Sequence, residues 1–288
     1  MKVRKALIVA AGLGTRMLPA SKVVPKEILP VVDTPAIQLV VEEVVASGIE
    51  EIVLLLGPGK EVLLKHFQPA PTLERYLEQR GKQELLELLR GTSRMARFTT
   101  AWQSEPLGLG HAVLQAREAI GNEPFAVLLP DDIFDCERPC LRQLLDQSER
   151  TDEPTVALSR VPRSELSKYG IVAVEPAGRR LYRLTGMIEK PAIERAPSDL
   201  AILGRYVLTP DVFDLLALVK PGTGGEIQLT DALLGLSTRR RLYGYEFEGL
   251  RYDLGDRVGF LTAQIGYGLK QPQLADRLRA WLERSLKS

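Results

Sequence analysis

The chain has 288 residues, 45% of them hydrophobic, which is enough to bury a large core. Its 38 basic and 37 acidic side chains give a net charge of +1, and this balance argues against a nucleic-acid-binding protein. No apolar run is long enough for a membrane span and no signal peptide is recognisable, so we expect a cytoplasmic protein. Cys136 and Cys140 form a poor zinc motif and are expected to be free thiols.

The first predicted element is a buried strand that runs into a glycine loop. Residues 6–10 are apolar, and Gly12 and Gly14 follow them directly. Glycines let the backbone approach a ligand, and their exposed N–H groups can form an anion nest. A glycine turn alone would be explained by structure. Arg16 and Lys26 on the same loop favour polyphosphate binding instead. The pattern is neither a Walker loop nor a dinucleotide fingerprint.

Strands and helices then alternate at lengths typical of βαβ units. We predict a helix at residues 35–47, a strand at 51–56, a short helix at 59–67 and a strand at 97–103. Residues 73–89 are charged and leucine-rich, and are expected to form an exposed helical excursion. The alternation predicts an α/β fold with a Rossmann-like, mixed but mainly parallel central sheet flanked by helices.

A second glycine turn follows the strand that ends at Gln103. Gly108 and Gly110 open a predicted helix, which a tight β–α turn alone could explain. The functional interpretation is a flat slot in which a base lies against glycine backbone. The Gln103 amide can donate and accept at once, which suits the edge of uracil. His111 is expected to have a structural role in the turn.

Two aspartates follow apolar strands. Residues 125–130 form a fully apolar run, and Asp131 and Asp132 come directly after its last leucine and proline. Carboxylates at the C-terminal end of a central strand lie where open α/β sheets bind ligands, and they suit Mg²⁺. One of the two could instead cap the following segment. Asp253 is a second strand-end carboxylate, so Asp131 and Asp253 could flank one Mg²⁺.

The second half of the chain contains shorter strands that alternate with turn signals. Three of them, at 171–175, 181–189 and 201–208, are expected to form a small antiparallel extension that closes off a sugar site. The remaining predicted elements are a helix at 141–147, strands at 155–161 and 242–247, a helix within the segment from 224 to 231 with Gly224 and Gly225 before it, and an amphipathic helix at 271–287.

The first loop resembles a family signature. Residues 12–32, read as G-L-G-T-R-M-L-P-A-S-K-x-x-P-K-E-x-L-P-V-V, are similar to the signature of sugar-nucleotide pyrophosphorylases, in particular the bacterial UTP–glucose-1-phosphate uridylyltransferases. Further matches are G-L-G-H-A-V at 108–113, E-K-P at 189–191 and A-I-L-G-R-Y at 201–206. The resemblance covers essentially the whole chain.

The resemblance implies a Mg²⁺-dependent transfer of a uridylyl group from UTP to glucose 1-phosphate. It implies one nucleotidyltransferase domain, in which residues 1–150 mainly bind the nucleotide, 151–255 mainly bind the sugar and 256–288 form C-terminal helices. A homo-oligomer, a dimer or tetramer, is also implied. The residues carried over are Arg16 and Lys26 for catalysis; Ala11, Gly12, Gly14, Thr15, Gln103 and Gly108 for the nucleotide; Gly170, Glu189, Lys190 and Gly204 for the sugar phosphate; and Asp131 and Asp253 for Mg²⁺.

Three positions depart from the family pattern. Leu107 and Leu250 stand where relatives carry lysines, and Leu254 stands where they carry a cysteine. Lost cations could weaken substrate binding unless Arg251 replaces them, whereas Leu254 is expected to be a packing change. Two alternatives follow: the same chemistry with dTTP or another sugar 1-phosphate, or a weakly active regulatory paralogue that binds UDP-glucose. A structural α/β protein without a site would leave the loop cations and strand-end carboxylates unexplained.

Overall fold

A nine-stranded sheet runs through the computed structural model, which describes residues 1–222 and 225–287. The strands β10 and β11 run against the direction of the others, so the sheet is mixed and mainly parallel. In spatial order the strands are β5 (Arg97–Trp102), β4 (Glu51–Leu56), β1 (Lys5–Ala10), β6 (Phe125–Leu128), β11 (Leu200–Leu208), β8 (Thr155–Arg160), β12 (Tyr243–Glu246), β10 (Leu181–Glu189) and β9 (Gly170–Gly178).

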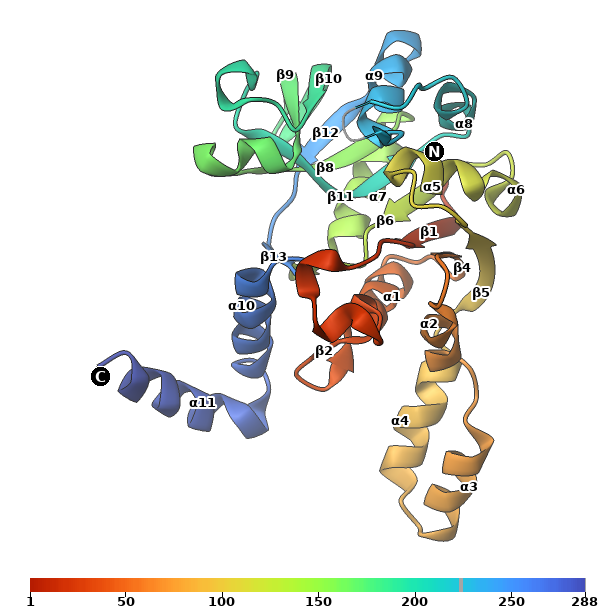
Figure 1. Cartoon of the computed structure of the whole chain (residues 1–288), viewed down its shortest axis with the longest axis vertical. Coiled ribbons are helices and arrows are strands. Elements are labelled where there is room, and N and C mark those ends of the chain that lie inside the picture. The colour runs from red at the N-terminus through yellow and green to blue at the C-terminus, as the bar shows by residue number, and fades with distance from the viewer. Residues whose placement is uncertain (223–224, 288) are drawn as a thin grey trace.

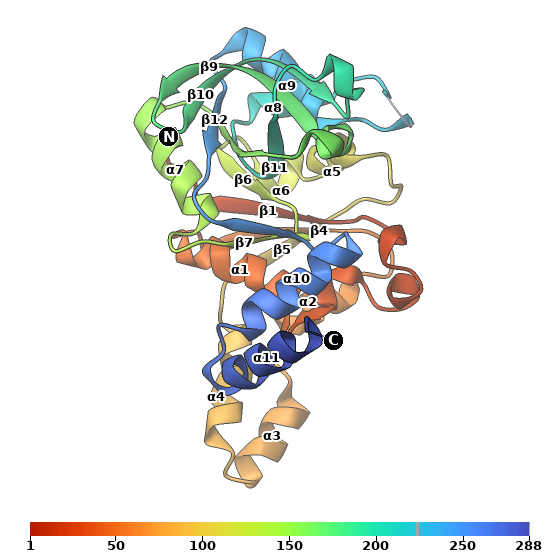
Figure 2. The ribbon, with the colours of Figure 1, turned by 90° about the vertical axis from the view of Figure 1, so that its left-hand side faces the viewer.

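The central strands read as unbroken apolar runs because both of their faces are covered. Alternate residues of β1 enter two separate cores, with Ile8 on one face of the sheet and Leu7 on the other. Figures 1 and 2 show helices on both sides. The Ile8 side is covered by α1 (Ala36–Ala46), α2 (Glu61–His66) and α7 (Cys140–Thr151), and the Leu7 side by α5 (Leu109–Gln115), α6 (Arg117–Ile120), α8 (Asp211–Leu216) and α9 (Leu229–Arg239).

Two helical arms extend from this layered body (Figure 1). One is formed by α3 (Pro71–Gln79) and α4 (Gln83–Ser93), and the other by α10 (Arg257–Gly268) and α11 (Pro272–Ser285). The excursion expected at residues 73–89 is therefore two helices, because the chain turns between them at Gly81, whose φ is 63°. The amphipathic helix predicted at residues 271–287 is α11, and α10 is a further helix within the segment 256–288, for which C-terminal helices were expected.

Two small sheets lie outside the main one. The first pairs β2 (Pro30–Val31) with β3 (Thr34–Pro35), and the second pairs β7 (Asp132–Asp135) with β13 (Leu250–Asp253) in antiparallel fashion. The strand β7 was not among the elements predicted from the sequence. Its pairing sets Asp132 directly opposite Asp253, so the chain segment after β6 and the segment near residue 250 meet at one place.

The predicted α/β architecture is confirmed, with one correction. Residues 201–208 are not part of an antiparallel extension: β11 lies inside the main sheet between β6 and β8, and all nine of its residues are buried. The extension consists of the long pair β9 and β10, which joins the sheet through β12. The helix predicted after the glycines is α9, which begins at Leu229; Gly225 precedes it, and Gly224 lies outside the described residues.

Other expectations concern the cysteines and the membrane. Cys136 and Cys140 are both free, as predicted, and Cys140 is buried. Within residues 1–222 and 225–287, none of the helices combines the length and the apolar character needed to cross a bilayer.

Candidate active site

The loop after β1 folds back on itself. Gly14 has a left-handed φ of 67° and leads into a short 3₁₀ turn, Thr15–Met17, and two further 3₁₀ turns follow at Ala20–Lys22 and Lys26–Ile28. The Ser21 hydroxyl donates a hydrogen bond to the Gly14 carbonyl (Oγ to O, 2.7 Å). A Cβ on Gly14 would lie 3.3 Å from that of Ser21, so the fold-back favours glycine.

The cations of this loop face the two strand-end aspartates. The Lys26 ammonium lies 2.5 Å from Asp131 Oδ2. Arg16 reaches both carboxylates, with Nη2 3.9 Å from Asp131 Oδ2 and Nη1 3.8 Å from Asp253 Oδ2. The structure thus brings together four residues from three separate parts of the chain that were proposed from the sequence.

This arrangement keeps Asp131 ionised. Burial alone would raise the pKa of Asp131, but Lys26 and Arg16 outweigh burial and hold that pKa below its ordinary value. Burial likewise opposes the charge on Lys26, yet the contact with Asp131 dominates and raises the pKa of the lysine. Both groups are therefore charged at neutral pH, and a carboxylate in this state can bind a metal ion.

Asp132, whose role the sequence left open, turns to a different partner. Arg251 donates from Nε to Asp132 Oδ1 over 2.7 Å, and its Nη2 lies 3.5 Å from Asp253 Oδ2. Burial raises the pKa of Asp132 to about 6, against the opposing charge of Arg251. Arg251 thus links Asp132 to Asp253 and adds a cation beside the two candidate metal ligands.

A cavity of about 440 Å³ opens between the loop and the second glycine turn. Gln103 lies in its wall and is only 5% exposed. Its amide nitrogen contacts His111 Nδ1 at 2.9 Å and the Gly108 carbonyl at 3.2 Å, so His111 orients Gln103 as well as shaping the turn. The proposed nucleotide residues that line this cavity are Ala11, Gly12, Thr15, Gln103 and Gly108, together with Lys26 and Asp131.

A second cavity, of about 220 Å³, lies under β9 and β10. Glu189 Oε2 accepts a hydrogen bond from the Thr230 hydroxyl at 2.6 Å. A Cβ on Gly170 would meet both of those groups, at 3.1 and 3.2 Å, so glycine keeps this space open. The proposed sugar-site residues Gly170, Glu189 and Gly204 line the cavity, as do Arg16, Asp131 and Asp253.

Lys190 is placed differently from the other proposed sugar residues. Its side chain is 46% exposed and it is absent from the cavity wall. Its φ is 46°, a left-handed conformation that costs a non-glycine residue on the order of 1 kcal/mol. The Lys190 amide donates to the Tyr169 carbonyl at 3.0 Å, which helps to hold this conformation beside the cavity.

Asp131 lies in the wall of both cavities, and Asp253 lies in the wall of the smaller one. These two carboxylates offer hard oxygen ligands beside a cationic loop, a donor set that suits Mg²⁺. Among the residues that the structure describes, no group of three or more His, Cys, Asp or Glu side chains is arranged to hold a metal. The pair would therefore bind Mg²⁺ together with phosphate oxygens and water, which is its usual mode of binding.

Sequence reasoning missed one buried ion pair at the site. Lys60, in the turn after β4, lies 2.7 Å from Glu27 Oε1, and both side chains are at most 9% exposed. Within the described part of the chain, the other oxygen of Glu27 has no hydrogen-bond partner. Burial lowers the pKa of Lys60, although Glu27 opposes this shift. Glu27 belongs to the P-K-E segment of the family signature, at residues 25–27, but no local sequence pattern indicated Lys60 as its partner.

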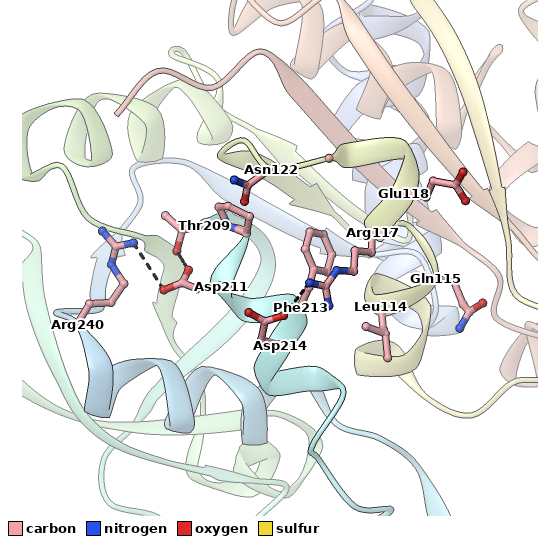
Figure 3. Close-up of a pocket in the computed structure, with 12 residues that line it drawn as sticks. Leu114, Gln115, Arg117, Glu118, Asn122, Thr209, Asp211, Phe213, Asp214 and Arg240 are labelled. Atoms are coloured by element: carbon pink, nitrogen blue, oxygen red, sulfur yellow. Dashed lines mark hydrogen bonds and ion pairs between the residues drawn. The ribbon is translucent and has the colours of Figure 1, made fainter.

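A separate hollow lies at the other end of the strands (Figure 3). It is bounded by the residues just before β6 and just after β11, whereas Asp131 follows β6. Four of its charged side chains form two pairs: Arg117 with Asp214 at 2.7 Å, and Arg240 with Asp211 at 3.8 Å. The candidate site residues do not line this hollow.

This chain is thus an α/β protein with a layered sheet and two adjoining cavities. Its glycine loop places cations at the C-terminal ends of the strands, where proteins of this class bind ligands such as phosphates. The family model described as nucleotidyl transferase matches residues 5–268. The chain therefore belongs to the nucleotidyl transferase family.

Relatives and solved structures match nearly the full chain. It is 49% identical over 282 residues to a UTP--glucose-1-phosphate uridylyltransferase of Bacillus subtilis (strain 168), covering 98% of this chain and 97% of the relative. A UDP-glucose pyrophosphorylase complexed with UDP-glucose is similar with a TM-score of 0.87 and 39% identity, over 94% of this chain and 100% of that chain. A UTP-bound UGPase from Acinetobacter baumannii gives a TM-score of 0.88 and 36% identity, over 98% and 99%.

Proposed function

We propose that this protein transfers the uridylyl group of UTP to glucose 1-phosphate, giving UDP-glucose and pyrophosphate. The observation that carries the proposal is the pair of cavities that meet at Asp131, because two substrates must lie side by side for the transfer. The names of relatives that are about half identical to this chain support the choice of UTP and glucose 1-phosphate.

The reaction needs no protein nucleophile. An oxygen of the sugar phosphate attacks the α-phosphorus of UTP in line, and the bond from that phosphorus to the pyrophosphate oxygen breaks. Arg16 and the amides of the glycine loop are proposed to hold the β- and γ-phosphates and stabilise the leaving pyrophosphate. Lys26 is proposed to offset charge on the α-phosphoryl group, which requires its ammonium to shift from Asp131 towards the substrate.

The substrates are held from opposite sides of Asp131. Gln103 and Gly108 are proposed to bind the base in the larger cavity, and Glu189 to bind sugar hydroxyls in the smaller one. Lys190, exposed at the edge of the smaller cavity, is proposed to contact the sugar phosphate. Residues 1–150 would thus mainly serve the nucleotide and 151–255 mainly the sugar.

Asp131 and Asp253 are proposed to hold Mg²⁺, which would supply positive charge to the reacting phosphates when bound. The contacts of Arg16 and Lys26 with the same two carboxylates support this assignment, because Asp131 and Asp253 already stabilise positive charge at this place. We also propose that the protein is a homo-oligomer and that it acts in the cytoplasm.

The test is pyrophosphate release from UTP and glucose 1-phosphate, measured with Mg²⁺ and with a chelator in its place. We expect rapid release that stops on chelation. A panel containing dTTP and other sugar 1-phosphates tests specificity. Leu107, next to the second glycine turn, makes this test necessary, because it is 38% exposed and lacks the positive charge that the family pattern implies there. Tight UDP-glucose binding without pyrophosphate release would instead favour a regulatory paralogue.

A further inference from the structure

Arg205 is a fully buried charge on β11 that the proposed chemistry does not use. Its side chain is 0% exposed, and it lies where the pairing of β11 with β8 shifts in register, between Leu203 and Tyr206. A buried guanidinium is costly unless its donors are satisfied. The contacts that satisfy it lie directly behind the candidate active site.

The two terminal nitrogens of Arg205 hold both ends of one turn. Nη1 donates to the Leu129 carbonyl and Nη2 to the Asp132 carbonyl, each over 2.9 Å. Asp131, the candidate metal ligand at the seam of the two cavities, lies within this turn. Its own carbonyl accepts a hydrogen bond from the Leu254 amide at 2.7 Å, which ties the turn to the segment that carries Asp253.

Glu43 of α1 holds Arg205 in turn. Its carboxylate accepts from Arg205 Nη2 at 2.7 Å and from Nε at 3.1 Å, and its side chain is 8% exposed. Glu43 Oε1 also accepts from the Leu141 amide at the start of α7, at 2.9 Å. Phe134 covers the guanidinium, with its ring centroid 4.5 Å from Cζ. The guanidinium of Arg205 is thereby contacted from α1 and β7, while the first turn of α7 holds Glu43 in place.

We propose that Arg205 and Glu43 are positioning residues that hold the turn of residues 129–132, and so set Asp131 opposite Asp253 for binding a divalent cation. This inference rests on the proposed function of Asp131 and Asp253 as metal ligands. Neither Arg205 nor Glu43 lines either cavity, so their effect must pass through the turn. Mutation of residues that hydrogen-bond to a metal ligand commonly lowers metal affinity by about 10- to 100-fold.

The test uses Glu43→Gln, which keeps the shape and the hydrogen-bond acceptor but removes the charge. Arg205→Lys is the second variant; it keeps the charge but loses the planar fork. Hydrogen–deuterium exchange of peptides covering residues 129–135 and 250–256 reports the turn directly. Pyrophosphate release gives the Mg²⁺ concentration for half-maximal activity and the KM for glucose 1-phosphate.

We expect faster exchange in both peptides and a rise of about tenfold in the Mg²⁺ requirement. The KM for glucose 1-phosphate should rise less than the Mg²⁺ requirement, by under about twofold, because Glu189 is held by Thr230 and the Lys190 amide by Tyr169 rather than by the turn. The matched control is Glu153→Gln, which removes the partner of Arg240 (2.8 Å) far from the turn and should leave both readouts unchanged.

Unchanged exchange and an unchanged Mg²⁺ requirement in a folded Glu43→Gln variant would overturn the inference. An equal rise in the Mg²⁺ requirement and in the KM for glucose 1-phosphate would also overturn it, because that pattern indicates general loosening. If Glu43→Gln does not fold, Arg205→Lys is judged by the same criteria. A wild type that releases no pyrophosphate would refute the proposed function, and the exchange measurement would still decide whether Arg205 and Glu43 hold the turn.

Discussion

At the scale of single residues, the site depends on a few charges that face one another across chain segments far apart in sequence. Arg16 lies within 4 Å of both Asp131 and Asp253, and its side chain is 62% exposed, so it remains accessible to a ligand. Exposed ion pairs of this length contribute little to stability. The placement of Arg16 is therefore better explained by binding than by folding.

Arg16→Ala is expected to lower the turnover number by about a hundredfold or more, because it removes a donor that is proposed to stabilise charge on the leaving pyrophosphate. Thermal stability should change little, since the side chain is largely exposed. Steady-state kinetics of pyrophosphate release and a thermal melt check both statements. Near-normal turnover in the variant would exclude the proposed role.

Gly108→Ala should destabilise the protein by about 1–3 kcal/mol. The φ of Gly108 is 100°, and an added Cβ would lie 2.7 Å from the Ile227 carbonyl oxygen. The control is Gly91→Ala in α4, where a Cβ meets nothing and where alanine is the better helix former, so stability should rise slightly. Urea denaturation of the two variants measures the difference; equal midpoints would contradict this account of Gly108.

At the scale of elements, the second helical arm begins with a defined cap. The Asp256 carboxylate accepts hydrogen bonds from the Val258 and Gly259 amides, each at 3.1 Å, and so satisfies two free donors at the start of α10. The Gly259 amide is the main reason that the pKa of Asp256 is lowered. This cap fixes the direction in which α10 leaves β13.

Asp256→Ala should lower the free energy of unfolding by about 1 kcal/mol at neutral pH, whereas Asp256→Asn, which can also cap, should cost less. Because the folded-state pKa is lowered, the contribution of the charge is complete above the ordinary value of 3.8 and is lost as the pH falls through the folded-state pKa. Denaturation at pH 7 and below pH 3.8 checks this. A gap between wild type and Asp256→Ala that widens in acid would contradict it.

Local sequence predicted those elements whose information is local. The apolar run of β1, the glycine loop after it and the apolar run before Asp131 were all recognisable from neighbouring residues. The pairing of β7 with β13 was not, because its registers join residues more than a hundred positions apart. The same holds for Arg205 and Glu43, whose contact spans 162 positions and leaves no spacing signal in the chain. The roles of individual site residues remain predictions.

At the scale of the whole molecule, ligand binding should raise stability, because the proposed substrates bind to the folded chain alone. Saturation with UTP and Mg²⁺ at about 100 times the dissociation constant should add about 2.7 kcal/mol and raise the melting temperature. The rise should disappear in Asp131→Ala and persist in Arg117→Ala, which alters the distant hollow of Figure 3. Thermal melts with and without ligand make the measurement. An equal rise in both variants would argue against a metal–nucleotide site at Asp131.

The position of β11 limits where the chain can be divided into fragments that fold. Its residues come from the second half of the chain, yet they complete the hydrogen bonding of β6, the last strand that the first half contributes to the nine-stranded sheet. A fragment ending near residue 150 would keep an apolar strand with an unsatisfied edge, which invites aggregation. A chimaera could join the proposed nucleotide-binding half of this chain to the sugar-binding half of a relative at a single crossover. Such a chimaera should therefore fail to fold, unless the relative's half carries a strand that pairs with β6.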